Sequence, residues 1–369
     1  MNLINKYLRN FKQYKVASHK IWTVSEKERK GILKLDWNES TIQPTPRVKE
    51  RLLKLIERND FFNLYPSTYN DKLYELLSNY VGLPKEDIQY FGSSDSLHEY
   101  IAKMFINVGD PVIILWPSYD NFRLTAEVNG GRVFYFEYNS DFSFDSNGFK
   151  SFIAEKEASL VYICNPNNPS GHLHTITFIE DLLQSFPETV FLIDEAYYEF
   201  TMPRTTCSSL VEKYENLLIT RTMSKAFGIA NFRFGYLIAN SKNINYISTI
   251  RNPKNITTFA QEAAIAVLED VDYMNKYVEE VNAAKKEFLT NLKSIKQITA
   301  FESNANFVVI RFGSFDEKSC VYDWLVSNNI FVRPINQSPI VHECLRITIG
   351  TREQMLRVFN VLKEFYEKQ

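Results

Sequence analysis

The 369-residue chain has few cysteines and almost no net charge. Its four cysteines, at positions 164, 207, 320 and 344, lie far apart, and no pair has the spacing of metal ligands. A disulfide scaffold and a metal site are therefore not expected, and the thiols fit a reducing compartment. A net charge of −2 gives no electrostatic footprint for nucleic acid.

Long apolar segments are also lacking. The longest strong apolar run in a candidate strand, Val112–Trp116, is far too short to cross a bilayer. The first residues, Met1–Lys6, have no apolar core of signal-peptide length. We therefore expect a cytoplasmic protein with no membrane partner. The length allows two or three domains, or one large α/β domain with an appendage.

Short apolar runs alternate with amphipathic stretches from about residue 88 to residue 240. Fully apolar strands that alternate with helices are typical of an α/β fold with a mainly parallel sheet covered on both faces. The predicted strands of this seven-stranded sheet are Ile88–Phe91, Val112–Trp116, Arg132–Glu137, Leu160–Cys164, Val190–Ile193, Leu217–Thr220 and Gly235–Ala239.

The pattern changes after about residue 252. Thr351 followed by Gln354 forms a capping box that predicts the start of the last helix. We expect an N-terminal arm at 1–35, a large domain at 36–252 and a smaller α+β domain at 253–369. The elements expected in the smaller domain are mostly helical sequence over Thr258–Leu292, strands at Asn306–Phe312, Ile330–Pro334 and Leu345–Ile349, and a helix around Lys318–Ser327.

Polar clusters follow three of the predicted strands. Gly92–Asp95 follows the first strand, Asn165–Gly171 follows the fourth, and Asp194 ends the fifth. Ligands of open α/β sheets bind beyond the carboxyl ends of the strands, so these clusters are expected to converge on one site.

Each cluster has a chemical interpretation and a structural one. Ser93 and Ser94 at a helix N-terminus can seat an anion, or they can simply cap the helix. Asp194 can pair with a pyridinium nitrogen, or it can act as a cap or ion-pair partner. Asn168, in a turn fixed by prolines, offers a rigid amide or an ordinary Asx turn.

Lys225 lies in the run Arg221–Gly228, with Arg233 eight residues after it. Ser224 places a hydroxyl beside the amine. This arrangement suits a lysine that forms a Schiff base with an aldehyde cofactor whose phosphate is held nearby. Taken alone, a serine–lysine pair is far more often a surface lysine in a polar turn.

Taken together, these segments resemble pyridoxal-phosphate enzymes of fold type I, the class I/II aminotransferases, and within them the histidinol-phosphate aminotransferase type. The resemblance extends from about residue 35 to the C-terminus. The segments that carry it are NPNNPSG at 165–171, DEAY at 194–197, RTMSKAFGIANFRFGY at 221–236, LDWNE at 35–39, YP at 65–66, PSY at 117–119 and CLRITIGT at 344–351.

The resemblance implies pyridoxal 5'-phosphate as cofactor and a role for each matching residue. Lys225 would form the Schiff base and move a proton between the substrate carbon and C4′ of the cofactor. Asp194 would pair with the pyridine nitrogen, while Asn168 and Tyr197 would bond the phenolic oxygen. Tyr119 would stack on the ring. The residues implied to hold the phosphate are Ser93, Ser94, Thr222, Ser224 and Arg233.

The resemblance also implies a homodimer, because Tyr65 would reach the cofactor phosphate of the neighbouring subunit. Arg346 matches the arginine that holds the anionic end of the substrate, and Arg333 matches a second arginine of the subgroup. Planar guanidinium groups hold carboxylate or phosphate through two hydrogen bonds. Asn38 and Trp37 are expected near the substrate.

Three segments depart from the family pattern. Trp37 stands where a small residue usually precedes the asparagine, and no proline follows Glu39. Ser94 and Asp95 replace an Asp-Glu pair. Asn231 replaces a glycine in the turn that carries Arg233. None of these departures removes an expected cofactor contact. Trp37 and Ser94 are expected near the mouth of the site, so the identity of the substrate is left undetermined.

The expected activity is transfer of an amino group between glutamate and a small phosphorylated carbonyl compound. Histidinol phosphate, and hence amino-acid biosynthesis, is the default, and an aminotransferase of a surface-polysaccharide pathway is the rival. A decarboxylase of phosphoserine or phosphothreonine is an alternative, since it would use the same lysine and arginines. A non-catalytic sensor is disfavoured, because about 35 residues before the family region leave no room for a typical DNA-binding module.

Overall fold

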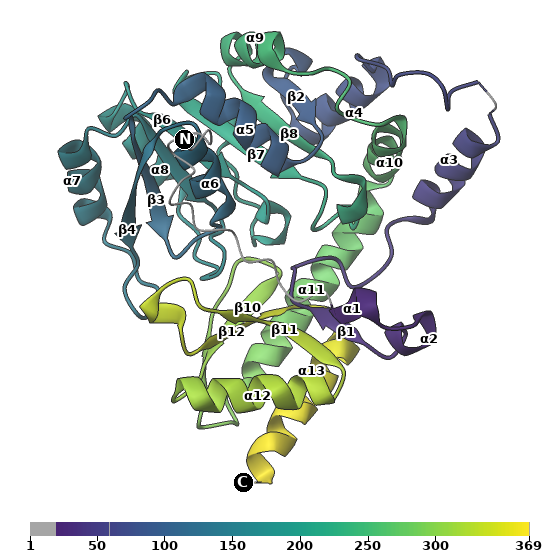
Figure 1. The fold of residues 1–369 in the computed structure, drawn as a ribbon, viewed down its shortest axis with the longest axis vertical. Helices are drawn as coiled ribbons and strands as arrows, with labels where there is room; N and C mark the ends of the chain where they lie inside the picture. Colours follow the sequence, from purple (N-terminus) through teal and green to yellow (C-terminus); the bar gives the residue numbers. More distant parts are fainter. Residues whose placement is uncertain (1–19, 59, 369) are drawn as a thin grey trace, which may run out of the picture.

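The computed structural model describes residues 20–58 and 60–368. Two sheets organise this part of the chain, one of seven strands in the upper half of Figure 1 and one of five strands below it. The long helix α11 (Val271–Leu292) passes from the region of the large sheet to the small one. In the described part of the chain, no helix is both long and apolar enough to span a bilayer.

The large sheet has the strand order β2-β8-β7-β6-β5-β3-β4. β8 runs antiparallel to both of its neighbours, and the other pairs within the sheet are parallel. The prediction of a mainly parallel seven-stranded sheet is therefore confirmed. The strands are β2 (Ile88–Phe91), β3 (Pro111–Trp116), β4 (Arg132–Glu137), β5 (Leu160–Cys164), β6 (Val190–Asp194), β7 (Leu217–Thr222) and β8 (Gly235–Ala239).

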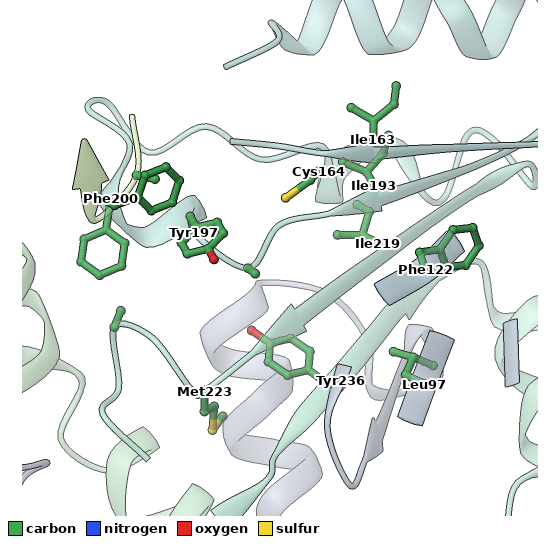
Figure 2. Packing of buried hydrophobic residues seen from close by; sticks show 14 of the residues in the cluster. Leu97, Phe122, Ile163, Cys164, Ile193, Tyr197, Phe200, Ile219, Met223 and Tyr236 are labelled. Carbon is green, nitrogen blue, oxygen red and sulfur yellow. The ribbon is translucent and has the colours of Figure 1, made fainter. Parts of the chain in front are cut away.

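The apolar runs become strands because both of their faces are buried. Every residue of β5, β7 and β8 is buried. Ile163, Ile193 and Ile219 are register partners across β5, β6 and β7, and Figure 2 shows them side by side. Branched side chains pack well in such cross-strand rows. The next register row carries Asp194. Packing of the three isoleucines therefore fixes the position of this carboxylate at the end of the sheet.

Helices cover the large sheet and begin at the caps that the sequence supplies. Thr175 caps α8 by accepting a hydrogen bond from the Phe178 N–H group, and α8 then buries Ile179, Leu182 and Leu183 at helical spacing. The helices of this part of the chain are α3 (Pro46–Ile56), α4 (Asp71–Val81), α5 (Ser94–Phe105), α6 (Asn121–Val128), α7 (Ser146–Lys156), α8 (Ile176–Ser185), α9 (Ser241–Ile250) and α10 (Thr258–Leu268).

The small sheet has the order β1-β11-β12-β10-β9. β1 pairs parallel with β11, so residues expected in the N-terminal arm lie in this sheet; residues 1–19 of that arm are outside the described part. The predicted capping box of Thr351 and Gln354 starts α13. The elements are β1 (Leu33–Leu35), β9 (Thr299–Phe301), β10 (Phe307–Arg311), β11 (Ile330–Ile335), β12 (Cys344–Thr348), α12 (Phe315–Ser327) and α13 (Arg352–Glu367).

Short helical turns complete the fold. Within residues 20–58 and 60–368, two precede β1 and five are 3-10 turns in connections. Strands β1 and β9 were not predicted, because three residues are too short for a periodic pattern. The turns are α1 (Lys20–Thr23), α2 (Glu26–Arg29), η2 (Lys85–Asp87), η3 (Tyr198–Phe200), η4 (Ser208–Leu210), η5 (Ala230–Phe232) and η6 (Pro339–Val341).

Candidate active site

A cleft of about 1890 Å³ lies between the two sheets, where the carboxyl ends of β5, β6 and β7 face the small sheet. It collects nearly all of the residues predicted from sequence. Among its lining residues are Trp37, Asn38, Ser94, Tyr119, Asn168, Asp194, Tyr197, Thr222, Ser224, Lys225, Arg233, Arg333 and Arg346.

Lys225 follows β7 and directs its amine into the cleft. Its Nζ donates a hydrogen bond to the carbonyl oxygen of Trp37 at 3.0 Å. Burial in the cleft, followed by the positive charge of Arg346, lowers the pKa of Lys225 to about 8. A sizeable fraction of this amine is therefore neutral near physiological pH, which is the form that attacks a carbonyl carbon and accepts protons.

Asp194 is the last residue of β6 and is 3% exposed. Its Oδ2 accepts a hydrogen bond from the Tyr162 hydroxyl at 2.8 Å, and its Oδ1 accepts one from the Ala196 N–H group at 3.2 Å. Nε2 of the buried His98 lies 3.9 Å from Oδ2. Burial raises the pKa of Asp194, so its anion gains from a cationic hydrogen-bond donor that enters from the cleft.

Tyr197 joins the two sheets through a chain of side-chain contacts. Its hydroxyl oxygen accepts hydrogen bonds from the amides of Asn38 and Asn168, each at 3.1 Å. Asn168 in turn accepts a bond from Arg346 at 2.7 Å. Asn38 has a left-handed backbone (φ 57°), and Thr348 accepts its N–H bond at 3.0 Å. The cleft wall is therefore held from both sides.

Groups that can form a pocket for an anion lie at the N-terminus of α5. Ser93 caps this helix by accepting a bond from the Ser96 N–H group at 3.1 Å. A Cβ atom at Gly235 would lie 2.5 Å from the Ser94 nitrogen, so β8 can pass this turn only because residue 235 is glycine. The backbone N–H groups of a helix start, together with serine hydroxyls, form an anion site. Ser93 itself is buried beneath the cleft surface.

Hydroxyl and guanidinium groups complete the opposite side of this pocket. The Thr222 and Ser224 hydroxyls are 2.9 Å apart, and Arg233 donates to the Ser224 hydroxyl at 3.4 Å. Asp95, which was not predicted as a site residue, accepts bonds from Arg233 at 3.2 Å and from the Tyr119 hydroxyl at 2.9 Å. Asp95 thus orients both side chains, a role that only the folded chain reveals.

Two arginines line the cleft from the small sheet. Arg333 on β11 and Arg346 on β12 are direct partners in the antiparallel register. Arg346 is 9% exposed and donates to the carbonyl oxygen of Asp36 at 2.6 Å. Directly opposed like charges destabilise a sheet, so a bound anion with two negative oxygens would relieve this arrangement.

Tyr65 is not part of its own chain's cleft. Its side chain is 78% exposed, and Nζ of Lys254 lies 4.4 Å from its ring centroid. Trp22 of α1 lines the cleft although it was not predicted to do so. The sequence carries no local signal for Trp22, because its contact depends on how the chain before β1 folds back.

A second buried network, also missed from sequence, lies behind Tyr197. Arg221 and Glu195 form an ion pair with an N–O distance of 2.9 Å and exposed side-chain fractions of 2% and 1%. Glu199 is 1% exposed, its Oε1 accepts a bond from Tyr80 at 3.4 Å, and its Oε2 has no hydrogen-bond partner among the described residues. Burial raises the pKa of Glu199 to about 7.

We expect Glu199→Gln to stabilise the protein at about pH 8. The folded state keeps Glu199 protonated up to about pH 7, whereas the unfolded chain ionises near the ordinary value of 4.5. Between pH 4.5 and about pH 7 the unfolded state therefore binds fewer protons than the folded state. The free energy of unfolding falls as the pH rises through this range. Removing the charge should raise the free energy of unfolding by about 1–3 kcal/mol above that range. Denaturant unfolding of the protein at several pH values measures this.

Glu195→Gln is the matched control for this prediction. It also replaces a buried carboxylate by an amide, but this carboxylate is paired with Arg221. It should lower stability, because an unpaired buried guanidinium is costly. Equal effects of the two substitutions would contradict the assignment of the unfavourable charge to Glu199.

Residues 30–362 match the family model of class I and II aminotransferases, and the chain belongs to this family. It is a pyridoxal-phosphate-dependent aminotransferase, as the sequence motifs predicted. A dihydroxyacetone phosphate transaminase of Campylobacter jejuni is 40% identical over 99% of this chain and 98% of its own length. A histidinol-phosphate aminotransferase of Ruminiclostridium cellulolyticum is 34% identical, covering 87% of this chain and 89% of its own.

The fold has a counterpart among solved structures. The histidinol-phosphate aminotransferase of Sinorhizobium meliloti, in complex with pyridoxal-5'-phosphate, superposes with a TM-score of 0.87 over 99% of both chains. At 23% identity this likeness establishes the fold. The predicted fold class, cofactor and enzyme class are thus confirmed.

Proposed function

We propose that this aminotransferase moves an amino group between glutamate and a small phosphorylated ketone of the dihydroxyacetone phosphate type. The observation that carries the proposal is the arginine pair, Arg333 and Arg346, which oppose each other in register and line the same cleft as Lys225. The 40% identity to a dihydroxyacetone phosphate transaminase over almost the whole chain supports this substrate class.

The two classes of relatives act on chemically similar compounds. Dihydroxyacetone phosphate and the ketone of histidinol phosphate each carry a carbonyl group one carbon away from a phosphate ester. They differ in the group on the other side of the carbonyl, a hydroxymethyl in one and an imidazolylmethyl in the other. Both need a dianion held at a fixed distance from the reacting carbon, and paired guanidinium groups suit a phosphate dianion.

The groups in the cleft fit pyridoxal phosphate. The buried Asp194 would hold the ring nitrogen, and the Tyr197 hydroxyl with Asn168 would hold the phenolic oxygen. Tyr119 would cover the ring, and the phosphate would lie at the start of α5. The residues proposed to hold that phosphate are Ser93, Ser94, Thr222, Ser224 and Arg233. When bound, the cofactor supplies an aldehyde for covalent attachment and a ring that withdraws electrons from the substrate carbon.

The chain's own groups would then bind, orient and move a proton. Arg346, fixed by Asn168 and the Asp36 carbonyl, would hold the anionic end of donor and acceptor in turn. This fixes the reacting carbon relative to Lys225. Lys225, with its pKa near 8, would take the proton from that carbon and return it, because its two protonation states are similar in free energy near neutral pH.

We also propose that the enzyme is a cytoplasmic homodimer. Side chains between α3 and α4 present an apolar surface: Phe62 is 64% exposed, Leu64 63% and Tyr65 78%. Exposed apolar side chains gathered in one segment are typical of a protein interface. In a dimer built on this surface, Tyr65 would be available to the partner's cleft.

A panel of amino acceptors assayed with glutamate tests the proposed activity. We expect turnover of dihydroxyacetone phosphate, measured as formation of 2-oxoglutarate, and much weaker turnover of the dephosphorylated ketone. Faster turnover of the ketone of histidinol phosphate would move the assignment to that substrate. Release of carbon dioxide from phosphoserine or phosphothreonine without a keto acid would replace transamination by decarboxylation.

A further inference from the structure

The segment Asp36–Glu39 forms the cleft wall next to the reactive amine, and all four of its residues line the cleft. Its backbone is fixed at two successive carbonyl groups. The Asp36 carbonyl accepts a bond from Arg346 at 2.6 Å, and the Trp37 carbonyl accepts one from Lys225 at 3.0 Å. The backbone at Trp37 is therefore anchored to both the amine and the guanidinium that the reaction uses.

Lys34 on β1 restrains the indole itself. Its Nζ lies 4.3 Å from the centroid of the Trp37 ring and 2.9 Å from Oδ1 of Asp36, and it also forms an ion pair with Glu39. The Lys34 side chain is 15% exposed, so solvent screens these contacts only in part. An ammonium held by two carboxylates against an aromatic face stabilises one position of the ring.

We propose that Trp37 sets the size limit of the substrate and that Lys34 is the positioning residue that holds Trp37 in place. The inference rests on the proposed function, since it concerns the group on the far side of the ketone from the phosphate. With the phosphate at the arginine pair and the reacting carbon at Lys225, the clamped indole leaves space for a hydroxymethyl group and excludes a planar ring such as imidazole.

Three tryptophans line the cleft within the described residues, and their surroundings distinguish them. Trp22 is 61% exposed, and the ring centroids of Trp116 and Tyr135 are 4.6 Å apart. Trp37 is the one whose own backbone bonds the Lys225 amine. A size limit imposed there acts on the part of the substrate nearest to the reacting carbon.

The test compares two amines as donors to 2-oxoglutarate: 2-amino-1,3-propanediol phosphate, which is the amine of dihydroxyacetone phosphate, and histidinol phosphate. Trp37→Ala should raise kcat/KM for histidinol phosphate relative to the smaller amine by about 10- to 200-fold, the range for steric discrimination in a pocket. Lys34→Met should shift the ratio in the same direction by less, and Lys34→Arg should keep the wild-type ratio.

Lys368→Met is the matched control. Lys368 forms a similar lysine–tryptophan contact, with Nζ 4.9 Å from the centroid of the Trp324 ring. Trp324 lies on α12 and Lys368 follows the last residue of α13, and neither residue lines the cleft. This substitution should leave the ratio unchanged. Because a ratio cancels loss of folded enzyme, a folding defect in Trp37→Ala cannot imitate the effect. Titration calorimetry with histidinol phosphate gives a second readout. Trp37→Ala should bind this amine more tightly than the wild type does.

Two results separate this inference from the proposed function. If wild-type enzyme uses neither amine, the proposed function fails. If wild-type enzyme prefers 2-amino-1,3-propanediol phosphate and Trp37→Ala keeps both the ratio and the weak binding of histidinol phosphate, the size limit lies elsewhere and this inference alone is overturned. A shift caused by Lys368→Met equal to that of Lys34→Met would also overturn the positioning role.

Discussion

Lys225→Met is expected to lower the rate of transamination by about 10³-fold or more, because it removes both the amine for covalent attachment and the base near the substrate carbon. The free cofactor and the substrates should still bind, since the phosphate pocket and Arg346 are untouched. Stopped-flow turnover with glutamate measures the rate. Mass spectrometry after borohydride reduction checks that the covalent link to the chain is lost.

Lys285→Met is a demanding control for this result. Burial also lowers the pKa of Lys285 to about 8, and its Nζ donates to the Ala305 carbonyl at 2.8 Å, yet it lies outside the cleft. The two lysines therefore share a pKa lowered to about 8 by burial and differ in location. Lys285→Met should keep the turnover rate and the covalent link. If it lost the link and Lys225→Met kept it, the assignment of the reactive lysine would be wrong.

Arg346→Lys should reduce kcat/KM for phosphorylated ketone and for glutamate by about 30- to 1000-fold, although the positive charge is conserved. The guanidinium bonds Asn168 and the Asp36 carbonyl at once, and one ammonium group cannot repeat that geometry and also hold an anion through two bonds. Loss of a buried, charged hydrogen-bond partner costs about 2–5 kcal/mol. Most of the change should appear in KM, because ground-state binding is weakened as well as orientation.

Arg311→Lys supplies the comparison for Arg346. Arg311 lies on the neighbouring strand β10, stacks 4.8 Å from the Phe301 ring centroid and donates to the Ile340 carbonyl at 2.9 Å, but it does not line the cleft. Its replacement should change stability slightly and KM not at all. Similar KM values for wild type and Arg346→Lys would show that the anion is held by other groups.

The sequence predicted the large sheet closely. All seven of its strands were placed within two residues of their observed ends, because a strand buried on both faces must be apolar throughout and is therefore visible in the sequence. Tyr65 illustrates the opposite case. Its motif was recognised, but its own chain leaves it 78% exposed, so a role in a neighbouring subunit stays a prediction.

Some neighbours of the site residues, and one unfavourable buried charge, could not be predicted from the sequence motifs. Asp95 and His98 lie within one turn of each other on α5. No sequence pattern marks them as neighbours of Tyr119, Arg233 or Asp194. They meet those residues only because β2, β6 and the turn before β8 end at the same edge of the sheet. The unfavourable charge of Glu199 is likewise a property of burial and cannot be seen in its residue type.

By itself the sequence determined the family, the fold class and the cofactor, because the chemistry of a Schiff-base lysine needs particular residue types in a fixed chain order. Only the tertiary structure decided how the substrate end of the cleft is built. Lys34 and Trp37 are close in the chain, but their contact becomes a wall beside Lys225 only when β1 pairs with β11 and Arg346 bonds the Asp36 carbonyl. Specificity depends on distances between side chains from both sheets, and these are fixed by packing.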